Sequence, residues 1–90
     1  MARIKVKKVL DGDTFQSTRG VFFRLAEIDT PEKREPGYNK AKGILKNLID
    51  SEELIIKIKG KSYGRKVVEA KIPGEKMTIN TKMKRKGYNS

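Results

Sequence analysis

The stretch FFRLAEIDTPE, at residues 22–32, constrains the fold of this chain more than any other. Its apolar residues favour a strand, yet Arg24 stands inside the run, and a charge beside a core needs a partner. Pro31 has no backbone N–H to give to a sheet, so the strand must end before it. We therefore expect a strand over residues 21–28 whose far end presents charged groups.

The partner of Arg24 is left open by the sequence. Its charge would be satisfied by a salt bridge to Glu27, Asp29 or Glu69. On the two-residue pleat of a strand, Arg24 shares a face with Ile28, whereas Asp29 lies on the other face. If Arg24 and Asp29 serve one site, the strand must therefore bulge or end between them, and bulges do occur beside active sites.

Two tight hairpins are expected around this stretch. Residues 3–10 alternate charged and apolar side chains, as a half-buried strand does. Asp11-Gly12 predicts a type I′ turn, because both residues tolerate the positive φ that this turn needs at its central positions. A second strand begins near Asp13, and the TRG segment at residues 18–20 turns the chain again. The first three strands should form a meander.

A helix follows the charged loop at residues 32–37. Apolar side chains recur at three- and four-residue spacing over residues 38–49, with lysines on the other side, and this pattern predicts an amphipathic helix. Gly43 lies within it, where glycine costs up to about 1 kcal/mol relative to alanine. We therefore expect Gly43 to pack closely against a strand.

Two more strands and a short helix complete the pattern. Residues 54–59 and 67–72 are typical of strands and are separated by a polar loop at residues 60–64. Methionines around Ile79 predict a short final helix that ends at Gly87. The fold expected is mainly β, a five-stranded OB-fold (Greek-key) barrel with one amphipathic helix between strands 3 and 4 and a short C-terminal helix.

The composition limits the kinds of catalytic and metal site that the chain can form. A chain of 90 residues supports one small core, so we expect residues 1–90 to form a single domain. The absence of cysteine and histidine excludes disulfides, cysteine-based zinc sites and the commonest general base. Catalysis would depend on carboxylates, arginines, lysines, hydroxyls or a hard cation. The net charge of +11 implies a polyanionic partner, and nucleic acid is the usual one.

The sequence carries no sign of a membrane segment. No apolar run approaches the roughly 20 residues that span a bilayer, and no signal-peptide apolar region stands at the start. We expect a monomer without membrane contact. The sequence leaves the compartment open: it is cytoplasmic by default, with a secreted protein trimmed of its leader as the alternative. Binding to anionic membranes or acidic proteins is a further alternative, which rests on charge alone.

Carboxylates are clustered although the chain is basic. Four of the eleven acids, Asp11, Asp13, Asp29 and Glu32, fall in two short motifs. Such a cluster suggests a hard cation, and two aspartates with one carbonyl and several waters favour calcium over magnesium. Taken singly, residues 11–13 also fit a plain hairpin turn, and residues 29–32 fit the start of a loop or a helix N-cap.

Three segments together resemble the signature of a known family. They are DGDT at residues 11–14, FRL at residues 23–25 leading into IDTPE at residues 28–32, and YGR at residues 63–65. In this order they are similar to the staphylococcal nuclease-like, or thermonuclease, family. The helix, the later strands and the final segment fall in the family's order too, so the resemblance covers nearly the whole chain.

The resemblance implies a calcium-dependent phosphodiesterase that cuts DNA and RNA, single-stranded for preference, with low sequence specificity and leaves 3′-phosphates. Magnesium and manganese are alternative ions. Carried across position by position, Asp13 and Asp29 would bind calcium through their carboxylates and Thr30 through its backbone carbonyl. Asp11 would act from outside the direct metal ligands.

The same resemblance assigns the substrate contacts. Arg24 and Arg65 would grip the scissile phosphate, and Glu32 would orient or deprotonate the attacking water. Tyr63 would contact phosphate, and Lys61 would replace a lysine that the family often carries where this chain has Ser62. A planar guanidinium can meet two phosphate oxygens at once, which suits the two arginines to this role.

One departure and one rival function remain open. Better-known members continue beyond the second helix through tyrosine-bearing loops and a third helix, so we expect residues 1–90 to bind nucleotides more weakly than those members do. The rival is a noncatalytic nucleic-acid-binding OB-fold module, since some domains of the family lose the catalytic acids and arginines. Retention of those residues in this chain favours the enzyme.

Overall fold

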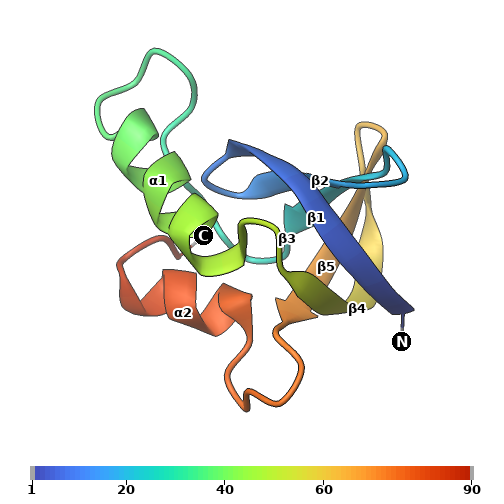
Figure 1. The fold of residues 1–90 in the computed structure, drawn as a ribbon. Helices are drawn as coiled ribbons and strands as arrows, with labels where there is room; N and C mark the ends of the chain where they lie inside the picture. The colour runs from blue at the N-terminus through green and yellow to red at the C-terminus, as the bar shows by residue number, and fades with distance from the viewer. Residues whose placement is uncertain (1, 90) are drawn as a thin grey trace.

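Seven elements make up the computed structural model, which describes residues 2–89 (Figure 1). In chain order they are β1 (Ala2–Asp11), β2 (Thr14–Ser17), β3 (Phe22–Leu25), α1 (Tyr38–Ile49), β4 (Glu53–Ser62), β5 (Arg65–Lys71) and α2 (Ile79–Arg85). The strands close into a barrel in the order β1-β2-β3-β5-β4. Neighbouring strands are antiparallel except β3 and β5, which pair in parallel. The predicted mainly β, five-stranded barrel with two helices is confirmed.

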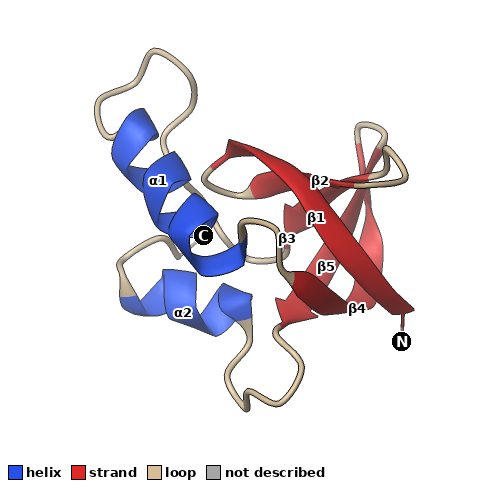
Figure 2. Cartoon of the chain, viewed as in Figure 1, coloured by secondary structure: helices blue, strands red, loops and turns tan. Residues whose placement is uncertain are grey.

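Both helices lie on one side of the barrel and extend its core (Figure 2). The amphipathic helix predicted over residues 38–49 is confirmed as α1, which buries Ala41, Leu45 and Ile49 at three- and four-residue spacing. The largest fully buried side chains come from the barrel and from both helices: Phe15, Leu25, Ile28, Leu45, Ile49, Leu54, Ile56, Val68, Ile79 and Met83. Burial of one such side chain stabilises a fold by about 1.5–3 kcal/mol, so the helices hold the barrel as well as cover it.

The third strand is shorter than predicted. β3 ends at Leu25, whereas the apolar run suggested residue 28. A turn follows directly, and Glu27 within it has a positive φ of 60°. The pleat is therefore interrupted between Arg24 and Asp29, as the sequence required if these two side chains were to serve one site.

The turn with two positive φ values that was expected between β1 and β2 occurs instead between β4 and β5. Neither Asp11, Gly12 nor Asp13 has a positive φ, so the β1–β2 turn is not the predicted type I′ turn. Positive φ values of 48° and 77° occur instead at Tyr63 and Gly64, with the strands paired up to them. The polar loop predicted at residues 60–64 is thus wrong: most of it is strand, and only a two-residue turn connects β4 to β5.

Close packing likewise falls on a different glycine from the one predicted. An added Cβ on Gly43 would meet no atom within 4 Å, so the expectation that Gly43 packs against a strand is wrong. A Cβ on Gly12 would lie 2.8 Å from the Cβ of Ala41 and 3.0 Å from the Cβ of Thr30. Because Gly12 has no side chain, the β1–β2 turn can approach α1 closely.

The short final helix is confirmed as α2, which stops just before Gly87. Its buried Asn80 joins the helix to the barrel. The Asn80 side chain donates to the carbonyl oxygens of Ala26 and Val68 and accepts from the backbone N–H of Ala70, each at 3.0 Å. One side chain therefore satisfies three backbone groups at the end of β3 and on β5, where an unpaired buried group would be costly.

Candidate active site

A cleft of about 550 Å³ opens where three connections of the barrel meet. These are the β1–β2 turn, the end of β3 with the segment after it, and the β4–β5 hairpin. The lining residues are Asp11, Asp13, Arg24, Asp29, Thr30, Pro31, Glu32, Lys33, Ser62, Tyr63 and Arg65. The barrel thus brings the three sequence motifs together and gathers every predicted site residue except Lys61 in one cleft.

Arg24 is held between a carboxylate and a carbonyl. Its Nη2 atom lies 3.3 Å from Oδ2 of Asp13 and donates to the carbonyl oxygen of Ile28 at 3.1 Å. The side chains of Arg24 and Asp13 are 26% and 13% exposed, so the pair is partly shielded from water. The sequence offered Glu27, Asp29 or Glu69 as partners, and all three are wrong for the described structure. Asp13 was assigned only a metal role, and closure of the barrel makes it the partner.

Arg65 reaches the same carboxylate through a threonine. Nη1 of Arg65 donates to Oγ1 of Thr14 at 3.2 Å, and that hydroxyl donates to Oδ1 of Asp13 at 2.9 Å. Thr14 is buried, so its hydroxyl needs both partners. Asp13 therefore connects the two arginines, Arg24 directly and Arg65 through Thr14. Thr14 belongs to the DGDT segment, and its sequence context predicted no role for it.

Asp11 is held by Tyr38, a residue of α1 that the sequence placed on the apolar face of the helix without a role in the site. The hydroxyl of Tyr38 lies 2.8 Å from both Oδ1 of Asp11 and the carbonyl oxygen of Leu10, and its one proton serves these two acceptors. The hydrogen bond to Asp11, with burial and the charge of that carboxylate, raises the pKa of Tyr38 above its ordinary value. Tyr38 thereby ties the β1–β2 turn to the start of α1.

Glu32 lies in the exposed connection between β3 and α1. Its backbone N–H donates to Oε1 of Glu35 at 2.6 Å, and the N–H of Glu35 donates to the Glu32 carbonyl at 2.8 Å. These reciprocal bonds fix the backbone at Glu32 within the loop. Within residues 2–89 the Glu32 carboxylate makes no hydrogen bond or ion pair, so it is free to act on a bound molecule.

The donor set fits a hard cation. Asp13 and Asp29 line the cleft and carry carboxylate oxygens, and Thr30, which is buried, lines it beside them. Calcium and magnesium both take oxygen ligands, with waters completing the coordination. No three acidic side chains of the described segment gather closely enough to hold a metal by themselves. Water and carbonyl ligands would therefore form a large share of the coordination.

Of the two predicted substrate contacts on the β4–β5 hairpin, Tyr63 lines the cleft and Lys61 does not. Tyr63 stands at the tip of the turn with 96% of its surface exposed, above the cleft it lines. Lys61 is exposed and lies outside the lining, because Ser62 is the neighbour that faces the cleft. The hairpin therefore offers an exposed ring and a hydroxyl to the cleft, with Arg65 as its cation.

Comparison with known proteins bears on the same segments. A family model described as "Staphylococcal nuclease homologue" matches residues 22–90. The matched range contains Arg24, Asp29, Glu32 and Arg65, whereas Asp13 precedes it.

One protein of Haemophilus influenzae, named as an uncharacterized endonuclease, is 32% identical over 87 residues. The alignment covers 92% of this chain and 48% of that protein, so the chain spans about half the length of this relative. Among the helices of residues 2–89, neither has the length and apolar character needed to cross a membrane.

Proposed function

Because the chain belongs to the staphylococcal nuclease homologue family, we propose that it is a calcium-dependent nuclease that hydrolyses phosphodiester bonds in DNA and RNA. We propose low sequence specificity and 3′-phosphate products. One observation carries the proposal: a single cleft is lined by two arginines, a free carboxylate and two aspartates, namely Arg24, Arg65, Glu32, Asp13 and Asp29.

The arginines would hold the phosphate that is cut. Attack on a phosphodiester builds charge on the phosphoryl oxygens, and two guanidiniums stabilise that charge more than they stabilise the ground state. Arg24 and Arg65 approach the cleft from β3 and β5. Their shared link to Asp13 orients both before any substrate arrives, so little ordering is left to occur on binding.

Glu32 would take the proton of the attacking water. The chain has no histidine, so a carboxylate is the ordinary side chain left for a general base. Glu32 suits this role because its backbone is fixed by Glu35 while its carboxylate has no partner in the described segment. Asp13 is less suited, because the Arg24 guanidinium and the Thr14 hydroxyl both contact it.

A bound cation would lie with Asp13, Asp29 and the Thr30 carbonyl as its protein donors. When bound, such an ion neutralises charge on the phosphate and lowers the pKa of coordinated water. Asp11, held by Tyr38, would add negative charge beside these donors. Cleavage rates in calcium, magnesium and manganese distinguish which of these ions supports activity.

Low sequence specificity follows from the kind of contacts that the cleft can make. Charged side chains dominate its lining, and contacts to phosphates carry no sequence information. Tyr63 could stack on any base, because every base has a π face. Single-stranded substrate is favoured because its bases are free to reach an exposed ring.

Cleavage of labelled single-stranded DNA and RNA in calcium, magnesium, manganese or chelator tests the proposal. We expect cleavage in calcium that chelator abolishes, with products whose mobility changes after phosphatase treatment because they end in 3′-phosphate. Arg65→Ala and Glu32→Ala should each lower kcat by about 100-fold or more, as loss of a transition-state contact does. Arg85→Ala and Glu52→Ala, at exposed positions outside the cleft lining, are the matched controls and should retain activity.

The same assay separates the rival function. Binding of the DNA in chelator without cleavage under any of these ions would favour a noncatalytic module. Cleavage that survives both Arg65→Ala and Glu32→Ala would show that this cleft is not the active site.

A further inference from the structure

A second pocket is lined by the first residues of β1. The start of β1 lies on the side of the barrel away from the two helices (Figure 2). The volume of the pocket is about 220 Å³, and it lies between the start of β1, the β2–β3 turn and the facing parts of β4 and β5. Its floor is apolar, made by Val21, Phe23, Ile56 and Ile58. We call it the barrel mouth.

Ile58 shows that the barrel mouth is open to solvent. It is 53% exposed, although it continues the inward series of Leu54 and Ile56 on β4. Half-buried Ile4 and Val21 line the same pocket, so Ile58 is part of a group of accessible apolar side chains at this end of the barrel.

Lys66 occupies an inward position of β5. It pairs directly with Phe23 on β3, which is buried, and it precedes the buried Val68 and Ala70 on the same face of the strand. A barrel interior normally takes an apolar residue at such a position. Lys66 is instead half-buried at the barrel mouth and makes no ion pair within residues 2–89.

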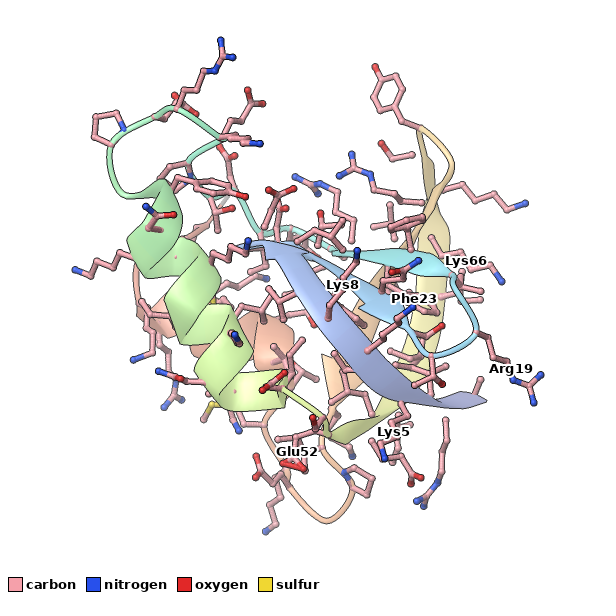
Figure 3. The ribbon with its side chains drawn as sticks, turned by 45° about the horizontal axis from the view of Figure 1, so that its top comes forward. Lys5, Lys8, Arg19, Phe23, Glu52 and Lys66 are labelled. Carbon is pink, nitrogen blue, oxygen red and sulfur yellow. The ribbon has the colours of Figure 1, made fainter. Side chains whose placement is uncertain are left out.

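The rim of the barrel mouth is basic, and within residues 2–89 Arg3 is the one cation of the rim that is paired with an acid. Its charged lining residues are Arg3, Lys5, Arg19 and Lys66, and no aspartate or glutamate of residues 2–89 lines it. Arg3 is paired with Glu53 at 2.9 Å, whereas Lys5 and Arg19 have no ion pair in the described chain. Figure 3 labels Lys5, Arg19, Phe23 and Lys66, which come from β1, the β2–β3 turn, β3 and β5. The occupant must therefore be small, partly apolar and anionic.

We propose that the barrel mouth binds one nucleotide of a single-stranded nucleic acid, with its base against Val21 and Ile58 and its phosphate at Lys66 and Arg19. A volume below the roughly 300–1,000 Å³ of drug-sized sites suits a single base and excludes a folded peptide. In single-strand binding a base packs on side chains while cations hold the backbone, and the barrel mouth offers aliphatic side chains beside Lys66 and Arg19.

The barrel mouth is separate from the candidate active site but shares its strands. Lys66 follows Arg65, and Phe23 precedes Arg24, so adjacent positions on β5 and β3 serve the two sites from opposite faces. The inference rests on the proposed function only in taking nucleic acid as the substrate. It adds a nucleotide held away from the bond that is cut.

Binding of fluorescent oligothymidylate, measured by anisotropy in chelator, tests the inference without cleavage. Lys66→Gln and Ile58→Ser should each weaken binding by about fivefold. Because a tenfold change in affinity corresponds to about 1.4 kcal/mol, this loss corresponds to about 1 kcal/mol. Lys46→Gln removes the same charge from the exposed face of α1 and should change the affinity by less than about twofold.

A second readout uses the unaltered protein. Methyl NMR signals of Ile56 and Ile58 should shift on titration with oligothymidylate and should not shift on addition of anionic phosphatidylserine vesicles. The inference is overturned if Lys66→Gln and Lys46→Gln bind equally well, or if the methyl signals respond to vesicles alone. A protein that never cleaves but still shows the Ile58 shifts would refute the proposed nuclease and support the barrel mouth.

Discussion

A Cβ atom placed on Gly12 would lie 2.8 Å from the Cβ of Ala41, closer than side chains pack. The φ of Gly12 is not positive, so crowding against α1, and not backbone strain, is what excludes a side chain there. The contact seats the β1–β2 turn, with Asp11 and Asp13, directly on the helix. The position of these two carboxylates therefore depends on the absence of one methyl group.

Gly12→Ala should destabilise the protein by about 1–3 kcal/mol, the range for overpacking, and should lower nuclease activity by displacing the turn. Thermal unfolding and kcat measure the two effects. Gly43→Ala is the control, because it adds the same methyl in open space within α1 and should stabilise by up to about 1 kcal/mol. Ala41→Gly should partly restore the stability that Gly12→Ala loses. If Gly12→Ala cost the same stability with alanine or glycine at position 41, the contact would be contradicted.

Thr14→Val should lower kcat by about tenfold, because Arg65 loses a hydrogen bond of about 1.5 kcal/mol that fixes its guanidinium. Thr14→Ser keeps the hydroxyl and should retain most of the activity. Kinetics of both variants at equal folded fraction provide the measurement. If Thr14→Val lowers only thermal stability and leaves kcat unchanged, the threonine is not positioning Arg65.

Asn80→Ala should destabilise by at least about 2 kcal/mol, because it removes the Asn80 partner of the Ala26 carbonyl and of the Ala70 N–H in the interior, whereas the Val68 carbonyl still accepts from the N–H of Ala26. Chemical denaturation measures the change. Asn47→Ala, at an exposed position of α1, should stay within about 0.5 kcal/mol of the parent. Equal effects of the two substitutions would contradict the role assigned to Asn80.

The raised pKa of Tyr38 predicts a loss of stability at high pH. Since the folded state holds the phenol proton more tightly than the unfolded state, the contribution is complete below the ordinary tyrosine pKa of about 10. It is lost as the pH rises above that value and through the higher folded pKa. Tyr38→Phe should therefore lose less stability above about pH 10 than the parent, measured by denaturation across the pH range. If Tyr38→Phe and the parent lost the same stability at high pH, the hydrogen bond between Tyr38 and Asp11 would be contradicted.

Local periodicity predicted the elements correctly because it is a property of neighbouring residues. Alternation placed Ile4 and Val6 on one face of β1, and three- and four-residue spacing placed Ala41 and Leu45 on the buried face of α1. The motif segments likewise identified most of the charged residues that line the cleft; Lys61 lies outside the lining, and Lys33 lines it although it was not predicted. Their chemical roles stay predictions until the assays above are made.

Sequence spacing could not predict which groups pair across the barrel. Arg24 and Asp13 meet because β2 and β3 lie side by side with Thr14 opposite Arg24, a register that depends on turn length and core packing together. Tyr38 reaches Asp11 only because Gly12 allows α1 to approach the turn. The early end of β3 depends on the turn at Glu27, which no apolar pattern marks.

The sequence by itself thus determined the barrel, its helices and the charged residues that line the cleft, since burial periodicity and motif identity are written along the chain. Only the tertiary structure decided that Asp13 links Arg24 to Arg65 through Thr14, that crowding explains Gly12, and that Lys66 faces the barrel mouth. These contacts join residues far apart in the chain, and closure of the barrel fixes their distances.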